Sequence, residues 1–247
     1  MTSSTRPVAL ITGGAHRIGA EIARTLHRSG LDIVLHYRSS REAAEGLKRE
    51  LERQRSDSVF LVKGDLCDMA QLSEVAEQAG GWRGRLDLLV NNASLFYPTP
   101  LEHASEAQWE ELMGTNLKAP FFLARALAPR LREKQGAIIN LVDIHAERPL
   151  AGHPVYSMAK AGNAMMVKSL ARELGPEIRV NGVAPGAILW PEQGLSEVAR
   201  EEIVSRTQLG RSGSPADIAG TVRFLALEAP YITGQIITVD GGRSVQQ

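Results

Sequence analysis

The sequence predicts one α/β domain, a Rossmann-like doubly wound fold with a seven-stranded parallel sheet and helices on both faces. Seven short apolar runs alternate with helical patterns along its 247 residues. The runs are continuous, which is typical of strands covered on both faces, and helix-length connections between them require parallel pairing. The length fits a single domain over residues 1–247. Ligands of such a sheet bind beyond the carboxyl ends of its strands.

The apolar runs give the expected strands in chain order. They cover residues 8–11, 33–35, 59–62, 86–90, 137–142, 179–183 and 236–239. Helical patterns fill the connections over residues 17–29, 42–54, 70–79, 105–132 and 156–174. Gly30 and Gly175-Pro176 are typical helix stops, and Pro120 should kink or divide the fourth stretch. Ser214 followed by Pro215 is typical of the cap and first turn of a last helix.

Residues 189–214 form the least regular segment, with Pro191, Gly194, Gly210 and Gly213. The segment follows the sixth expected strand and therefore lies at the edge of the sheet where ligands bind. We expect a lid that folds over a substrate and contributes to specificity. A plain surface excursion is the alternative, because irregular segments of this length are common on protein surfaces.

Composition excludes several classes of function. Lys plus Arg and Asp plus Glu both number 28, so there is no overall basic field to attract nucleic acid or an anionic membrane. The single cysteine, Cys67, cannot form an internal disulfide, and nothing around it favours a thiolate. The amino terminus lacks the pattern of a signal peptide, and no apolar run is long enough to span a bilayer. We expect a cytoplasmic protein without a metal.

A glycine-rich turn joins the first expected strand to the first helix and runs from Thr12 to Gly19. Gly13 allows the chain to turn sharply after the strand, and Gly19 allows the helix to pack closely. The amides at the amino terminus of that helix are then placed to bind a pyrophosphate. A glycine-rich turn by itself is weak evidence for a dinucleotide site.

The end of the second strand distinguishes NADPH from NADH. An acidic residue there would bind the ribose hydroxyls and repel a 2′-phosphate. The sequence has none and instead reads His36, Tyr37, Arg38, Ser39 and Ser40. A guanidinium and two hydroxyls suit a phosphate, so we predict NADPH. In the alternative reading, Arg38 and Ser39 only cap the next helix.

A tyrosine and a lysine lie much later in the chain than the glycine-rich turn, at a separation typical of a domain's length. Tyr156 and Lys160 are four residues apart on an expected helix and therefore share one face. The ammonium could lower the pKa of the phenol, which would let the tyrosine pass a proton near neutral pH. Exposed pairs of this kind are frequent, but the order of the two motifs in a chain of this length favours catalysis.

Together these motifs resemble the short-chain dehydrogenase/reductase family, although Arg17 stands where its usual turn has a middle glycine. The resemblance implies that Tyr156 is the proton donor, that Lys160 also binds the nicotinamide ribose, and that Asn116 helps to organise a proton relay. It implies cofactor contacts at the ends of the later strands. These contacts, together with Ile18 in the turn, are Asp65, Leu66, Asn91, Ala93, Ser94, Pro185, Gly186 and Ile188. Ser94 replaces the glycine of the family's Asn-Asn-Ala-Gly motif.

Asp143 departs from the family pattern, which has a serine at the end of the fifth strand. A carboxylate cannot donate a hydrogen bond to a ketone oxygen unless it is protonated. It can accept hydrogen bonds from ring N–H or amino groups, or help to hold a proton for an imine nitrogen. The substrate is therefore expected to be nitrogenous. The alternative is a damaged serine site, but a buried unpaired carboxylate would be costly.

Over nearly the whole chain these features resemble the pteridine reductases of that family. The resemblance implies that Phe96 stacks on a pterin, which a flat heteroaromatic ring makes physically reasonable. Packing of Phe96 within its own loop is the alternative. Trp190 could close the substrate pocket or anchor the lid. The expected substrate contacts are Arg17, Ser94, Phe96, Asp143, Tyr156 and Trp190.

The implied activity is hydride transfer from NADPH to a dihydropterin, an oxidised pterin or dihydrofolate. A ketone or 3-oxoacyl thioester reductase on the same scaffold is a second possibility, against which Asp143 argues. A non-enzymatic NADPH-sensing module is a third, which the presence of both Tyr156 and Lys160 disfavours. The resemblance also implies a homotetramer assembled through helices at residues 105–132 and 156–174.

Overall fold

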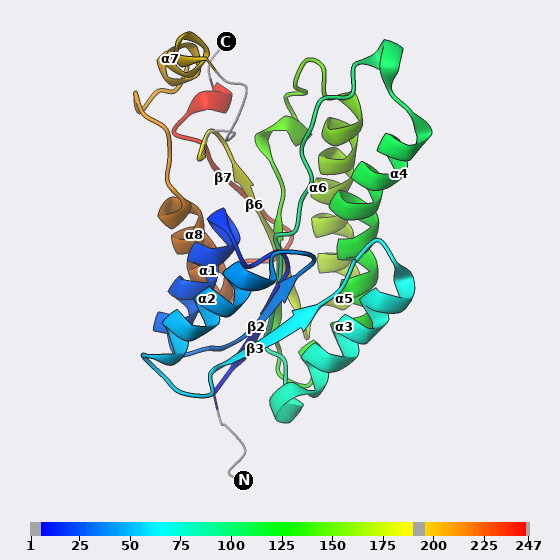
Figure 1. Cartoon of the computed structure of the whole chain (residues 1–247), viewed down its shortest axis with the longest axis vertical. Helices are drawn as coiled ribbons and strands as arrows, with labels where there is room; N and C mark the ends of the chain where they lie inside the picture. Colours follow the sequence, from blue (N-terminus) through cyan, green and yellow to red (C-terminus); the bar gives the residue numbers. More distant parts are fainter. Residues whose placement is uncertain (1–5, 190–195, 246–247) are drawn as a thin grey trace.

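A computed structural model describes residues 6–189 and 196–245 and shows a three-layer α/β fold (Figure 1). Its sheet has seven strands, all parallel, in the order β3-β2-β1-β4-β5-β6-β7. The strands are β1 Val8–Ile11, β2 Asp32–Tyr37, β3 Val59–Lys63, β4 Leu88–Asn91, β5 Ala137–Leu141, β6 Arg179–Pro185 and β7 Ile236–Val239. The predicted fold class is confirmed. The strand order reverses between β1 and β4, where a doubly wound sheet opens a crevice for a ligand.

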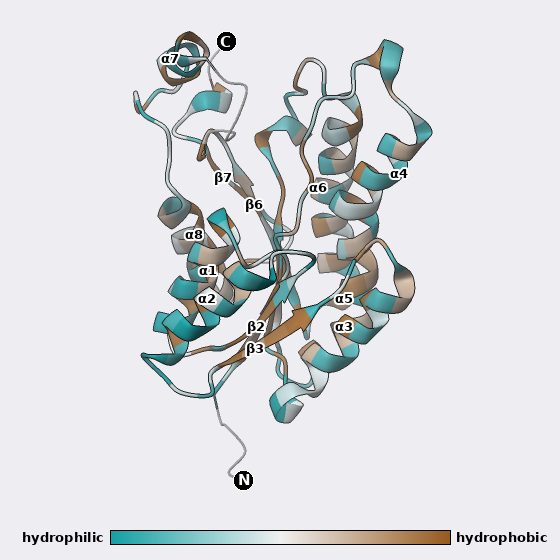
Figure 2. Ribbon diagram, viewed as in Figure 1, coloured by the Kyte–Doolittle hydropathy of each residue, from teal (hydrophilic) through white to brown (hydrophobic). Residues whose placement is uncertain are grey.

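Helices cover both faces of the sheet. One face packs against α1 Arg17–Arg28, α2 Arg41–Glu52 and α8 Pro215–Leu227. The other packs against α3 Met69–Gly81, α5 Ala119–Arg132 and α6 Pro154–Leu174. Figure 2 shows apolar residues along β2 and β3 and polar ones on the outer surfaces of α1 and α2. Burial on both faces explains why the strand sequences are continuously apolar.

The strands β2 and β6 extend past their apolar runs at the carboxyl end of the sheet. β2 continues through His36 and Tyr37, which pair with β3, and β6 continues to Pro185. Backbone pairing in the sheet does not require an apolar side chain, so polar residues at the crevice end still belong to strands. The residues expected to contact the cofactor are thereby fixed to the sheet.

The long stretch at residues 105–132 is divided, as Pro120 predicts. α4 Glu106–Met113 is followed by a π-helical turn over Gly114–Lys118 and then by α5. Pro120 lies in the first turn of α5, where a missing N–H is tolerated. The break thus falls just before the proline, and it contains Asn116.

The expected lid contains a helix that its irregular sequence does not reveal. α7 Glu197–Ser205 begins after Ser196, whose hydroxyl accepts a hydrogen bond from the Ala199 amide at 3.2 Å. Residues 190–195 of the same segment, including Trp190 and Pro191, lie outside the described residues. None of the described helices is both long enough and apolar enough to cross a bilayer.

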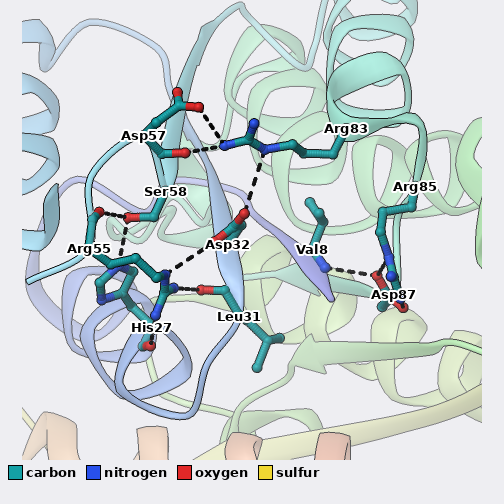
Figure 3. A network of polar contacts seen from close by, with 10 residues as sticks. All are labelled: Val8, His27, Leu31, Asp32, Arg55, Asp57, Ser58, Arg83, Arg85 and Asp87. Atoms are coloured by element: carbon teal, nitrogen blue, oxygen red, sulfur yellow. Dashed lines mark hydrogen bonds and ion pairs between the residues drawn. The ribbon is translucent and has the colours of Figure 1, made fainter. Parts of the chain in front are cut away.

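A polar network closes the opposite end of the sheet (Figure 3). Asp32, at the start of β2, is 1% exposed and lies between two guanidinium groups. Its carboxylate is 3.3 Å from Arg55 Nε and 3.5 Å from Arg83 Nε. Arg55 also donates to the carbonyls of His27 and Leu31. The network therefore joins β2 to the end of α1, the segment after α2 and the turn after α3.

Candidate active site

The glycine-rich turn packs tightly against the end of β4. Gly13 has a φ of +59°, and a Cβ there would lie 3.0 Å from Ala93 Cα. A Cβ on Gly19 would lie 2.6 Å from both the Gly13 carbonyl oxygen and Asn92 Nδ2. The Asn92 amide donates to the carbonyls of Thr12 and Gly13 at 2.9 and 3.0 Å. Only glycine fits these positions, as the sequence predicts.

The amino terminus of α1 is suited to an anion. His16 precedes the helix without a side-chain capping bond, and no acidic residue lies in the first turn. Arg17 is exposed there and has a φ of +52°. The positive end of the helix dipole and a cation therefore face the same space.

His36 ties three segments of this crevice together. Its Nδ1 accepts a hydrogen bond from the Gly13 amide at 3.2 Å, and its Nε2 lies 3.0 Å from the Gly64 carbonyl oxygen. The carbonyl can only accept, so Nε2 carries the proton. Burial lowers the pKa of His36 to about 4, which keeps the ring neutral and preserves this tautomer. The imidazole therefore holds the turn to the ends of β2 and β3.

A cleft of about 370 Å³ runs from the glycine-rich turn past β2 and β3 to the end of β4. Most of the predicted cofactor residues line it, namely Gly13, Arg17, Ile18, Gly19, His36, Tyr37, Arg38, Ser39, Asp65, Leu66, Ala93 and Ser94. Ser40, the second hydroxyl expected at the phosphate, also lines it. Sequence reasoning did not assign several further lining residues, which are Ala15, His16, Gly64, Cys67, Asn92, Leu95 and Thr115. Asn92 was discernible as part of the Asn-Asn-Ala motif.

Arg38 and Asp65 lie together at the mouth of the cleft. Arg38 Nη1 is 4.0 Å from Asp65 Oδ2, and both side chains are partly exposed. Ser39 and Ser40 follow Arg38 directly in the lining. The end of β2 thus combines a guanidinium with hydroxyls and carries no carboxylate of its own.

Asp143 and Tyr156 are in direct contact. The phenol donates a hydrogen bond to Asp143 Oδ2 at 2.7 Å. Asp143 Oδ1 accepts from the His145 amide at 2.8 Å, because Asp143 caps the short 3₁₀ turn Ile144–Ala146 after β5. The carboxylate is therefore fixed in orientation from both sides. The two residues expected to perform chemistry come from different elements and meet.

Lys160 lies on the same face of α6 as Tyr156. Its Nζ donates to the Leu141 carbonyl at 2.9 Å and lies 5.6 Å from the centroid of the Tyr156 ring. Its side chain is buried, and burial lowers the pKa of Lys160 to about 8 although Asp143 opposes this. These contacts bring the ammonium to β5 and to the ring of the tyrosine.

The predicted direction of the Tyr156 pKa is wrong. Burial raises the pKa of the phenol well above its usual value, and the charge of Asp143 and the hydrogen bond to it act in the same direction. A hydrogen bond from Ser94 lowers it only in part. The ammonium does not reverse these effects, so Tyr156 keeps its proton throughout the ordinary pH range.

Asn116 is buried in the π-helical turn and reaches Ser94. Its Nδ2 donates to the carbonyls of Leu95 and Leu112, both at 3.0 Å, and its Oδ1 accepts from the Ser94 hydroxyl at 2.6 Å. Asn91 is not among the residues that line the cleft. Its side-chain amide points into the interior and donates to Asn140 Oδ1 at 2.9 Å.

Phe96 lies beside the catalytic candidates and is 49% exposed. Its ring meets Tyr156 edge to face, with centroids 4.9 Å apart. It also stacks on His153, with centroids 4.7 Å apart and planes at 9°. Sequence reasoning missed His153, which precedes α6 without any motif. Trp190, predicted to be near this pocket, lies outside the described residues.

Pro185, Gly186 and Ile188 lie at the carboxyl end of β6, next to the end of β5 that carries Asp143. A Cβ on Gly186 would lie 2.5 Å from Asp240 Cβ, so the chain turns here against the segment after β7. Ile188 is buried. None of the three lines the cleft described above.

These observations define a site with two parts that meet at Ser94. One is an anion-binding cleft shaped for a dinucleotide, and the other is a phenol, a carboxylate and a lysine beside an exposed aromatic ring. Such a site can hold a nicotinamide cofactor and exchange a proton with a substrate next to it.

Comparison with known proteins agrees with this geometry. A family model described as "Enoyl-(Acyl carrier protein) reductase" matches residues 13–244. Pteridine reductase 1 of Leishmania tarentolae is 36% identical over 99% of this chain and 98% of its own length. The 3-oxoacyl-(acyl-carrier-protein) reductases FabG of Staphylococcus aureus strain Mu50 and Thermotoga maritima are 37% and 36% identical, each over 95% of this chain and 96% of their own length. The chain therefore belongs to the short-chain dehydrogenase/reductase family and is an oxidoreductase that uses a nicotinamide cofactor.

Proposed function

We propose that the protein is an NADPH-dependent pteridine reductase. The observation that carries this proposal is the 2.7 Å hydrogen bond from Tyr156 to Asp143. It places a carboxylate, rather than a hydroxyl, beside the proton donor. A carboxylate accepts hydrogen bonds from the amino and ring N–H groups of a pterin and has no donor for a ketone oxygen.

The cofactor, when bound, supplies a hydride to an electron-poor carbon of the pteridine. Tyr156 gives its phenolic proton to the adjacent ring nitrogen. Because burial and the charge of Asp143 raise the pKa of Tyr156, a free phenolate is unfavourable. A solvent proton, delivered as hydronium, therefore passes by way of Asp143 to the phenol oxygen as the phenol proton leaves. The pair returns to one carboxylate and one phenol, and charge and protons balance.

Phe96 orients the substrate ring in this proposal. Its position against Tyr156 would bring a stacked heteroaromatic ring next to the phenol. His153 stacks on the same phenylalanine and so fixes its plane. Ser94 lines the cofactor cleft and can contact both bound molecules.

NADPH, rather than NADH, is the proposed cofactor because Arg38, Ser39 and Ser40 line the cleft together and suit a 2′-phosphate. Asp65 holds the guanidinium at the mouth of the cleft. Comparable turnover with NADH at equal, subsaturating concentrations would contradict this choice.

The decisive experiment compares substrates for the purified protein. We expect rapid NADPH oxidation with dihydrobiopterin or dihydrofolate and none with a 3-oxoacyl thioester. The variant D143S should lose most pterin reduction and keep NADPH binding, since serine can still cap the 3₁₀ turn but cannot accept several N–H groups. Unchanged turnover in D143S would disprove the role of Asp143.

Reduction of a 3-oxoacyl thioester is the second candidate function, because two of the relatives named above carry that activity in their names. Turnover of the thioester alone would establish it. Tight NADPH binding without any turnover would instead indicate a sensing module, which the intact contact between Tyr156 and Asp143 disfavours.

We also propose a homotetramer. α5 and α6 expose Phe121, Met158 and Met165 on the surface, at 43%, 47% and 60% of their area. Apolar side chains gathered on neighbouring helices suit contact with a second copy. Light scattering of the purified protein would give four times the chain mass of 26.8 kDa. The segment at 189–214 remains our proposed lid.

A further inference from the structure

Four buried asparagines form a chain of amides beneath the catalytic face. Asn91 on β4 donates to Asn140 on β5 at 2.9 Å, and Asn140 donates to Asn163 on α6 at 2.9 Å. Asn163 in turn donates to the backbone carbonyl of Asn116 at 2.8 Å. Their exposed fractions are 4%, 0%, 2% and 1%. Burying this much polar surface is costly unless each group is paired, so the chain is a specific feature of this protein.

The chain of amides ends at the backbone carbonyl of Asn116, which cannot receive the hydrogen bond that an α-helix would give it. In an α-helix the Asn116 carbonyl would accept from the amide of residue 120, but Pro120 has no N–H. Asn163 supplies the hydrogen bond instead. The amide chain therefore stabilises the π-helical turn at Gly114–Lys118, and turns of this kind are frequent at functional sites.

The stabilised turn determines where Asn116 points. Its Oδ1 accepts from the Ser94 hydroxyl at 2.6 Å. That hydroxyl has one proton, and when it turns from Asn116 to the phenol oxygen it lowers the pKa of Tyr156. Asn163 also lies three residues after Lys160 on the same helix, so one face of α6 carries Tyr156, Lys160 and Asn163. A change at Asn163 would thus reach the phenol through Asn116 and Ser94.

We propose that Asn163 is a positioning residue for proton donation by Tyr156. It replaces the donor that Pro120 lacks and thereby fixes Asn116, which in turn orients the Ser94 hydroxyl beside Tyr156. This inference rests on the proposed role of Tyr156 as proton donor and is independent of which substrate is reduced.

The test compares two variants at this position with a matched control. N163L keeps the approximate size of the side chain and removes every hydrogen bond. N181L removes another buried amide, which donates to the Ile232 carbonyl at 2.7 Å and accepts from the Gln235 amide at 3.0 Å away from Tyr156. Both should lower the melting temperature. Only N163L should lower kcat, by about 10- to 100-fold, with an unchanged KM for NADPH.

N163D adds a readout that stability alone would not produce. An ionised aspartate accepts from Asn140 but cannot donate to Asn116, whereas a protonated one can do both. The activity of N163D relative to wild type should therefore rise as the pH falls, while that of N163L should stay constant. Wild-type kcat in N163L, or equal losses of kcat in N163L and N181L, would overturn the proposal.

Assays would use whichever substrate the wild-type protein turns over. Turnover of the thioester alone would overturn pterin reduction and leave the Asn163 test intact. Absence of turnover with every substrate would overturn both.

Discussion

At the scale of single residues, Lys160 is the catalytic candidate whose pKa can be measured most easily in a pH profile. Burial lowers its pKa to about 8, whereas the pKa of Tyr156 is raised well above its usual value. kcat/KM reports ionisations of the free enzyme. We expect kcat/KM for NADPH to fall as the pH rises through about 8, because the ammonium is lost while the phenol stays protonated. A profile that stays flat until the phenol ionises would contradict this assignment.

The two hydrogen bonds of the His36 ring give a second prediction. H36L would leave the Gly13 amide and the Gly64 carbonyl without their partner, and each unpaired buried group costs about 1–3 kcal/mol. The glycine-rich turn should loosen, so the KM for NADPH should rise about tenfold or more with little change in kcat. H36Q, which can both donate and accept, should restore much of the affinity. Equal KM values in H36L and wild type would show that the turn holds without the imidazole.

The sequence predicted which residues meet at the site but not how they are buried. Asp143 follows the end of β5 and Tyr156 lies near the start of the next helix, so their contact follows from topology. The direction of the Tyr156 pKa depends on burial and on the nearest charge, and no motif encodes either. Asn163 and His153 were not predicted for the same reason. A sequence pattern does not show which distant residues pack against a given side chain.

At the scale of elements, apolar periodicity and proline positions gave the strands and the division of residues 105–132. The helix α7 was missed because the prolines and glycines around it dominate the pattern, although Ser196 is a normal helix cap. The π-helical turn was also missed, since its stability comes from Asn163, which is distant in sequence.

The network around Asp32 joins elements at the end of the sheet opposite the cleft. D32N would leave Arg55 and Arg83 beside a neutral group, and breaking one side of a buried ion pair typically costs about 3–5 kcal/mol. We expect urea unfolding to show a loss of this order. The KM for NADPH at temperatures where the variant is folded should match wild type. A large change in KM would mean that the two ends of the sheet are coupled.

At the scale of the whole molecule, two buried neutral histidines make stability depend on pH. Burial lowers the pKa of His36 and of His27 to about 4, from 6.5 for an ordinary histidine, and the nearby Arg55 adds to the effect at His27. The unfolded chain therefore binds more protons than the folded one between about pH 6.5 and 4, so stability rises with pH across this window. His36 alone contributes on the order of 3 kcal/mol that is present above pH 6.5 and lost by about pH 4.

Urea unfolding at several pH values between 7 and 4 measures this dependence. Wild-type stability should decrease steadily as the pH falls, before most carboxylates become protonated. H36Q keeps a donor and an acceptor but cannot titrate, so its stability should decrease about half as steeply over the same range. The remaining slope belongs to His27, whose ring bonds Ser58 at 2.8 Å in the network at the other end of the sheet. Equal slopes for wild type and H36Q would mean that His36 titrates with its ordinary pKa in the folded protein. The hydrogen bonds of His36 with Gly13 and Gly64 would then have to be revised.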